Sequence, residues 1–166
     1  MCADAEKIPL ADSAVELVYS CFALQWCSSP ETALREIARV LAPGGRAVIA
    51  VPVAGSLREF RESWNEVDGQ VHFNALPPAS QWVSPIPGLD QVYAQQLEMR
   101  EHYADVRAVV TMLKATGANR VRREQPAGLM TPNRFQALVR GYEKRREAQG
   151  LPLSWQVLYL SFQKQG

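Results

Sequence analysis

The chain has 166 residues, of which 47% are hydrophobic and 21% are charged. This length is sufficient for one domain with its own apolar core, and the composition is that of an ordinary globular protein. A formal net charge of +1 argues against a generally basic surface that coats nucleic acid. No apolar run approaches the roughly 20 residues that span a bilayer, and the start of the chain lacks a signal-peptide pattern.

The three cysteines are Cys2, Cys21 and Cys27, an odd number at spacings that match neither a disulfide framework nor a zinc site. We therefore expect reduced thiols that act as small packing residues, no metal site, and a cytoplasmic protein.

The first fifty residues alternate between strand and helix patterns. The run Ala14–Ser20 is apolar and β-branched, as in a strand buried on both faces. Ser29 and Pro30 predict the N-cap and the first residue of a helix, which the Pro-Gly-Gly at 43–45 would end. A second strand is expected over 47–51. Two strands around one helix in so few residues indicate a right-handed crossover and parallel pairing. This is half of a doubly wound fold.

The middle of the chain, residues 56–104, has a different character. Ser56 and Glu59 are spaced as the capping box of a short amphipathic helix. The stretch 73–90 is rich in proline and aromatic residues and cannot form one regular element. An insertion of this kind is usually a lid or a binding loop, and sometimes only a linker.

The last third returns to regular patterns. A helix is expected from its N-cap Asp105 to a C-terminal Gly117, and a second helix from the Thr131-Pro132 start to Gly150. The stretch 154–164 has apolar residues at both odd and even positions, so both faces of a strand would be apolar, and it predicts a final buried strand.

The order and spacing of these motifs resemble a known family. The stretches DAEKIPLADSAVELVYSCFALQW and RVLAPGG are similar to the second half of class I S-adenosylmethionine-dependent methyltransferases. In the C-terminal part, LREFRESWNEVD, LKATGANRV and YEKRREAQGLPLSW resemble the malonyl-acyl-carrier protein O-methyltransferases of biotin synthesis. The resemblance implies an α/β, partial Rossmann-like sheet, mostly parallel with an antiparallel last strand. It also implies cofactor-core residues at 1–55, a lid at 56–104, and C-terminal core elements at 105–166.

The glycine-rich loop with which such enzymes begin is missing from this sequence. None of the ten glycines belongs to a Gly-x-Gly-x-Gly motif. We therefore expect a truncated form of the enzyme that is inactive by itself. Its exposed sheet edge would favour dimerisation.

The resemblance assigns the S-adenosylmethionine contacts residue by residue. Asp4 would accept a hydrogen bond from the adenine amino group, and the backbone of Ala5 would contact the ring. Cys21, Phe22 and Ala23 lie just past the first expected strand, where an open α/β sheet binds its ligand. The alternatives are that Asp4 only caps a turn and that Phe22 belongs to the core.

The expected reaction transfers a methyl group to the free carboxylate of malonyl-acyl carrier protein. This carboxylate is ionised near neutral pH, so we expect no catalytic acid, base or nucleophile, and alignment is the main requirement. The candidates for substrate binding are Gln25, Trp26, His72, Arg122 and Arg123, with Arg120 as a further cation for the malonyl group. A packing or solvated role for each of them is the alternative, and His102 is expected to be structural.

A locally basic helix is the candidate docking surface for the acidic carrier protein. Its cations are Arg134, Arg140, Lys144, Arg145 and Arg146. A solvated helix face is the alternative. Two other functions remain open: a class I methyltransferase for another small molecule, and a non-catalytic module that binds carrier protein.

Overall fold

The structure is a computed structural model that describes residues 3–68, 74–117 and 131–166. The chain folds into two compact units. The first unit comprises residues 1–56, 76–98 and 156–166, and the second comprises 57–75 and 99–155. The expected lid, 56–104, contributes residues to both units, and its role as a lid remains a prediction. None of the helices in the described ranges is long and apolar enough to cross a membrane.

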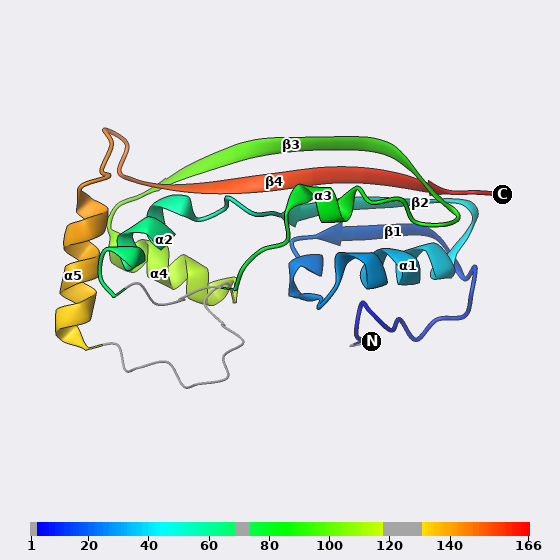
Figure 1. Cartoon of the computed structure of the whole chain (residues 1–166), viewed down its shortest axis with the longest axis horizontal. Helices are drawn as coiled ribbons and strands as arrows, with labels where there is room; N and C mark the ends of the chain where they lie inside the picture. Colours follow the sequence, from blue (N-terminus) through cyan, green and yellow to red (C-terminus); the bar gives the residue numbers. More distant parts are fainter. Residues whose placement is uncertain (1–2, 69–73, 118–130) are drawn as a thin grey trace. The chain divides into compact units, whose positions relative to one another are not determined.

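Within the described residues, four strands form one sheet in the order β1-β2-β4-β3 (Figure 1). Their bounds are Val15–Cys21 for β1, Leu41–Pro52 for β2, Leu89–Tyr103 for β3 and Leu151–Lys164 for β4. β1 pairs with β2 in parallel, whereas β2 pairs with β4 antiparallel. The α/β class and the antiparallel last strand are confirmed. The expectation of a mostly parallel sheet is imprecise, because the sheet is mixed.

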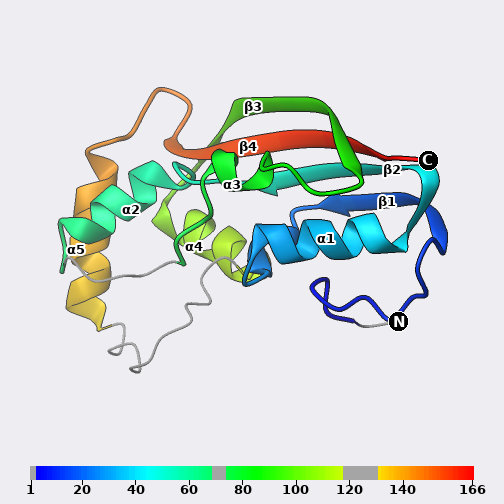
Figure 2. The ribbon, with the colours of Figure 1, turned by 45° about the vertical axis from the view of Figure 1, so that its right-hand side comes forward.

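Helix α1, Pro30–Val40, begins as the sequence predicts. The Ser29 hydroxyl accepts a hydrogen bond from the Thr32 amide at 3.2 Å, and Pro30 occupies the first turn. The buried face of α1 includes Leu34 and Ile37, which belong to the same core cluster as alternate residues of β2. In both views of the ribbon α1 lies alongside β1 (Figures 1 and 2).

The Pro-Gly-Gly at 43–45 does not end this helix. α1 stops at Val40, and β2 begins at the next residue. The pairing with β1 shifts from Val15–Leu41 to Leu17–Arg46, so the Pro-Gly-Gly forms a bulge inside β2. Gly44 has a φ of +75°, and a Cβ on Gly45 would lie 2.8 Å from the Ala42 carbonyl oxygen. The glycines therefore serve the bulge of a strand.

The described part of the second unit contains the helices α2 (Arg58–Asn65), α4 (Val106–Ala115) and α5 (Pro132–Glu143), together with one end each of β3 and β4. The predicted caps are confirmed, since the Asp105 carboxylate accepts from the Ala108 amide and the Thr131 hydroxyl accepts from the Arg134 amide. α5 is shorter than predicted. It ends at Glu143, and the chain then makes a tight turn in which Glu147 and Gly150 form a bridge.

The expected capping box at the start of α2 is wrong. Leu57 is the N-cap, with a φ of +58° and no side-chain hydrogen bond to the helix. The Ser56 hydroxyl instead donates to the Val53 carbonyl at 2.9 Å and accepts from the Gln156 amide at 2.9 Å. Glu59 bonds Ser154, 95 residues away. Distant partners therefore replace the local pattern.

The segment between α2 and β3 has little regular structure in its described part, apart from α3, Ala79–Trp82. This agrees with its proline content. The 15-residue strand β3 that follows was not predicted. Nearly all of its residues are exposed, so it lacks the buried apolar pattern by which strands are recognised in a sequence.

Candidate cofactor and substrate site

The candidate site begins where β1 ends. After Cys21 the chain turns at Phe22, which has a φ of +50°, a region that non-glycine residues rarely adopt. The Phe22 amide still donates to the Ala50 carbonyl of β2 at 2.8 Å, so this turn is tied to the sheet. A short 3-10 helix, η1 (Leu24–Trp26), follows and is anchored by the buried Leu24. The loop therefore has a defined conformation at the carboxyl end of a parallel strand, where open α/β sheets bind ligands.

The Gln25 side chain stabilises this loop through a hydrogen bond within it. Its amide nitrogen donates to the Phe22 carbonyl at 2.7 Å, and its side-chain oxygen is buried without a hydrogen-bond partner among the described residues. The Ser20 hydroxyl, near the end of β1, is likewise buried and unpartnered in the described part of the chain. Buried polar atoms without hydrogen-bond partners are uncommon in folded proteins, so each calls for an explanation. Sequence reasoning missed Ser20, whose only signal is a polar residue near the end of an apolar strand.

A second element, the turn at Asp4–Lys7, is held beside this loop. Asp4 caps its own turn, because its carboxylate accepts from the Glu6 amide at 2.9 Å. The two oxygens of the Glu6 carboxylate accept from the Ser28 and Ser29 amides, each at 2.9 Å. Glu6, which sequence reasoning missed, thus fastens the turn to the start of α1, two residues beyond Trp26.

The predicted cofactor residues are accessible. Asp4, Cys21 and Ala23 are exposed, and Ala5 and Phe22 are half-buried. Phe22 is not a member of the buried core cluster. Trp26, the predicted substrate residue, keeps 39% of its surface exposed. The fold therefore gathers the turn at Asp4 and the loop Cys21–Trp26 at one end of the first unit.

The structure does not place every predicted residue. His72, Arg120, Arg122 and Arg123 lie outside the described residues. His102 lies in the second unit, with its Nε2 atom 2.8 Å from a carboxylate oxygen of Glu147, which agrees with the expected structural role. Among the described residues no group of histidine, cysteine and carboxylate side chains could hold a metal ion.

The basic residues of α5 and the turn after it are mostly held in ion pairs. Arg134 pairs with Asp68, Lys144 with Glu66 at 3.1 Å, Arg145 with Glu66 at 2.8 Å, and Arg146 with Glu143 at 2.7 Å. Arg140 is exposed. The hydrogen bond from Arg145, followed by that from Lys144, lowers the pKa of Glu66. These carboxylates reduce the net positive charge that a docking partner would meet.

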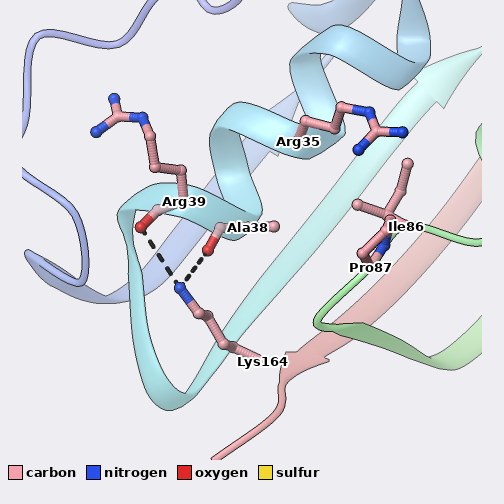
Figure 3. A pocket seen from close by; sticks show the side chains of 6 residues that line it. All are labelled: Arg35, Ala38, Arg39, Ile86, Pro87 and Lys164. Carbon is pink, nitrogen blue, oxygen red and sulfur yellow. Dashed lines mark hydrogen bonds between the residues drawn. The ribbon is translucent and has the colours of Figure 1, made fainter.

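A shallow pocket of about 260 Å³ lies at the other end of α1 (Figure 3). The cationic side chains that line it already have partners within the protein. Arg35 bonds Glu31, Arg39 bonds Glu36 and Asp12, and Lys164 donates to the Ala38 carbonyl at 2.6 Å. Lys164 thus caps the C-terminus of α1, where the helix dipole favours a cation and disfavours a bound anion. We assign this pocket a structural role.

Comparison with known sequences shows which proteins this chain is similar to. A profile of the methyltransferase domain matches residues 1–49, which include the turn at Asp4 and the loop after β1. The malonyl-acyl-carrier protein O-methyltransferase of Alcanivorax borkumensis is 49% identical over 166 residues, which cover 99% of this chain and 56% of that protein. The biotin biosynthesis bifunctional protein BioHC of Cellvibrio japonicus is 35% identical over 96% of this chain and 32% of that protein. The chain thus spans about half, or less, of the length of these relatives.

Solved structures agree on the fold. A protein from Bacillus halodurans, described as a methyltransferase, superimposes with a TM-score of 0.59 at 16% identity, covering 99% of this chain and 76% of that one. The YcgJ protein of Bacillus subtilis gives a TM-score of 0.56 at 16% identity, covering 99% and 70%. At this level of identity the likeness concerns the fold alone.

Proposed function

Because the chain belongs to the class I S-adenosylmethionine-dependent methyltransferases, we propose that it contributes to methyl transfer from S-adenosylmethionine to the free carboxylate of malonyl-acyl carrier protein. The observation that carries this proposal is the 49% identity to a malonyl-acyl-carrier protein O-methyltransferase over nearly the whole chain. The site geometry supports it, because three of the predicted cofactor residues, Cys21, Phe22 and Ala23, lie at the carboxyl end of a parallel strand.

The described residues suit the adenine end of the cofactor. In the turn at Asp4–Lys7, Asp4 is exposed and one of its carboxylate oxygens accepts from the Glu6 amide, so the other oxygen would accept from the adenine amino group, with the half-buried Ala5 beside it. Ser20, at the end of β1, and Gln25, in the loop that follows, each carry a buried polar atom that has no hydrogen-bond partner among the described residues. When bound, S-adenosylmethionine supplies a methyl group on a positively charged sulfur.

The task of this chain is then to orient the acceptor. A malonyl carboxylate is already ionised near neutral pH and needs no general base. Trp26, which is exposed on η1, would shield the malonyl carboxylate from water, and the Gln25 amide would help to align it. His72, Arg122 and Arg123 remain proposed contacts of the malonyl group, and Arg140, exposed on α5, is a proposed contact of the carrier protein.

Transfer of a labelled methyl group to carrier proteins tests this proposal. The enzyme would be this chain, alone and joined to the remaining part of the Alcanivorax borkumensis relative. From the joined form we expect label on malonyl-acyl carrier protein and none on acetyl-acyl carrier protein, which has no free carboxylate, and from the chain alone we expect no label. Label on the acetyl form would indicate a different methyltransferase. Carrier-protein binding without label from either form of the chain would indicate a non-catalytic module.

Titration of S-adenosylhomocysteine tests the cofactor residues separately. We expect Asp4→Ala to weaken binding about tenfold, since one charge-assisted hydrogen bond is lost. Asp90→Ala is the matched control, because Asp90 is exposed at the start of β3 and bonds only Gln165 among the contacts shown by the described residues. Equal affinities for both variants would contradict the role of Asp4.

A further inference from the structure

The strand β3 forms one edge of the sheet. It is the last strand on its side, next to β4, and both views of the ribbon show it along the outer side of β4 (Figures 1 and 2). The Gln96 side-chain amide donates to Gln156 of β4 at 2.9 Å, and the Gln156 amide donates to Glu98 at 2.7 Å, so β4 occupies the inner edge. Among the described residues no strand lies beyond β3. Its outer edge can therefore accept a further strand.

The features that usually protect an edge strand are weak in β3. It has 15 residues, whereas strands commonly have about five or six, and it contains neither proline nor glycine. Residues 90–101 are all exposed, and because successive side chains alternate, both faces of the strand are open to solvent. Val92, Tyr93 and Leu97 keep 64%, 48% and 44% of their surfaces exposed. A long strand of this kind is a template for pairing with another chain.

The sequence of β3 is complementary to itself in one antiparallel register. When a twofold axis relates two antiparallel strands, one residue lies opposite its own copy, because opposite pairs alternate between two hydrogen-bonding types and the axis preserves the type. With Gln95 at the centre, Asp90 lies opposite Arg100 of the second copy, and Tyr93 lies opposite Leu97 of the second copy. Each pair occurs twice. This register thus combines two pairs of opposite charge with two aromatic–aliphatic pairs, and both kinds stabilise adjacent strands.

The neighbouring registers lose these charge pairs. With Ala94 at the centre, Asp90 would lie opposite Glu98, so that like charges meet twice. With Gln96 at the centre, Arg100 would lie opposite a valine, and its pairing with Asp90 would be lost. Charge complementarity therefore selects the register around Gln95.

Both charged side chains are accessible for this contact. Asp90 is exposed, and one of its carboxylate oxygens accepts from the Gln165 amide at 2.7 Å. The Arg100 side chain keeps 38% of its surface exposed, and its guanidinium lies 3.4 Å from Glu59 and 3.3 Å from Glu147. A guanidinium has five donors, so Arg100 can bind a further carboxylate in addition to these two.

We propose that two copies of this chain pair through their β3 edges, antiparallel and centred on Gln95, into a dimer whose sheet continues from one copy to the other. Tyr93 and Leu97 of both copies gather on one face of the joined strands, and the Asp90–Arg100 pairs lie on the opposite face. β3 and β1 are the two ends of the sheet in the described residues. The contact therefore differs from the β1 edge at which the sequence predicted dimerisation, and it leaves the candidate cofactor site after β1 uninvolved.

Site-specific cross-linking tests the proposal, because molecular mass alone does not show which surface joins two copies. Cys2, Cys21 and Cys27 are first replaced by serine, and Gln95→Cys is then introduced. Opposite residues of an antiparallel pair have Cα atoms about 4.5 to 5.5 Å apart, a distance that a disulfide spans. Gln91→Cys is the matched control, since Gln91 is an exposed glutamine of the same strand. Position 91 lies opposite position 99 of the second copy, so the two introduced thiols would be about 27 Å apart.

Under mild oxidation we expect Gln95→Cys to form a disulfide-linked dimer at least tenfold faster than Gln91→Cys. In the unmodified background, Tyr93→Glu should weaken the dimer at least tenfold in sedimentation equilibrium, because it brings two carboxylates into the apolar face. Val83→Glu should leave the dimer unchanged, since Val83 is an exposed apolar residue directly after α3 and outside β3.

Three results would overturn the proposal: equal cross-linking of the two cysteine variants, no cross-linking of either, or a dimer that Tyr93→Glu leaves intact. Circular dichroism checks that the variants fold, which is expected because the replaced β3 side chains are exposed. Neither measurement involves methyl transfer, so failure of the proposed function would leave this inference standing, and its own failure would leave the proposed function untouched.

Discussion

At the scale of single residues, Glu59 connects parts of the second unit that are far apart in sequence. Its side chain is nearly fully buried and accepts from the Ser154 amide at 3.0 Å and the Ser154 hydroxyl at 2.6 Å. Arg58 and Arg100 lie 3.2 and 3.4 Å from the same carboxylate. Burial raises the pKa of Glu59, but the hydrogen bonds from Ser154 and the charge of Arg58 outweigh it, so the pKa lies below its usual range.

Replacing this carboxylate should be costly. We expect Glu59→Ala to lower the free energy of unfolding by about 3 kcal/mol, because the Ser154 donors are left buried and unpaired. Glu59→Gln, which keeps one acceptor, should cost less. Glu31→Ala is the control, since the Glu31–Arg35 pair is exposed, and its effect should stay within about 0.5 kcal/mol. Urea denaturation measures all three, and similar losses for Glu59→Ala and Glu31→Ala would disprove this role.

A turn at the end of α5 depends on one glycine. Gly150 has a φ of +128°, and a Cβ there would lie 2.5 Å from the Tyr103 carbonyl oxygen. Gly150→Ala should therefore destabilise the protein by about 3 kcal/mol, from strain and backbone displacement together. Gly88→Ala is a matched comparison, because Gly88 also has a positive φ, +77°, but open space around it. Gly88→Ala should lower the free energy of unfolding by about 1 kcal/mol, as measured by thermal unfolding. Equal destabilisation by the two substitutions would show that the close approach to Tyr103 contributes nothing.

At the scale of elements, α1 organises the beginning of the chain. Glu6 binds the amides at its N-terminus, and Arg39 near its C-terminus binds the segment that leads into β1. The Arg39 guanidinium reaches the Ile8 and Leu10 carbonyls at 2.7 and 2.8 Å as well as Glu36 and Asp12. One planar group with five donors makes all of these contacts.

Lysine cannot reproduce this arrangement, because its single ammonium group lacks the planar fork. We expect Arg39→Lys to loosen residues 8–12 while β1 and β2 stay intact. Hydrogen exchange should be at least tenfold faster at the Ile8 amide, which bonds Glu36. Arg35→Lys is the control, because the Arg35 guanidinium forms hydrogen bonds and an ion pair only with Glu31 among the described residues. Unchanged exchange at Ile8 in Arg39→Lys would contradict this assignment.

At the scale of the whole molecule, acidic side chains in ion pairs determine the response to pH. The hydrogen bond from Arg39 lowers the pKa of Glu36 to about 2, against the weaker opposing effect of burial. The pKa values of Glu59, Glu66 and Glu143 are also lowered. The folded state thus binds fewer protons than the unfolded chain at acidic pH, and its stability is lost as the pH falls.

We expect the urea midpoint to be constant between about pH 5 and 8, where these carboxyls are ionised in both states, and to fall as the pH decreases toward about 2. Glu36→Gln should start from a lower midpoint near pH 7 and show a shallower decline, since one of the responsible groups is gone. A decline as steep as that of the unmodified protein would exclude Glu36 as a contributor.

Short-range patterns in this sequence predicted local structure well. Ser29 with Pro30, Asp105, and Thr131 with Pro132 each act within one helical turn, and all three helix starts are confirmed. The capping box at Ser56 and Glu59 failed because Gln156 and Ser154 compete for the same side chains from about 95 to 100 positions away. The end of α5 and the whole of β3 were missed for a similar reason, since a turn against Tyr103 and pairing at a sheet edge leave no local signature.

The sequence by itself therefore determined the α/β class, the three capped helices, the parallel β1–α1–β2 unit and the resemblance to class I methyltransferases, because these depend on spacing and residue type over short stretches. Only the tertiary structure decided that Glu6 ties the Asp4 turn to the loop after β1, that most cations near the end of α5 are paired, and that β3 forms a long exposed edge of the sheet. Such features arise from contacts between distant segments, whose partners no local pattern specifies.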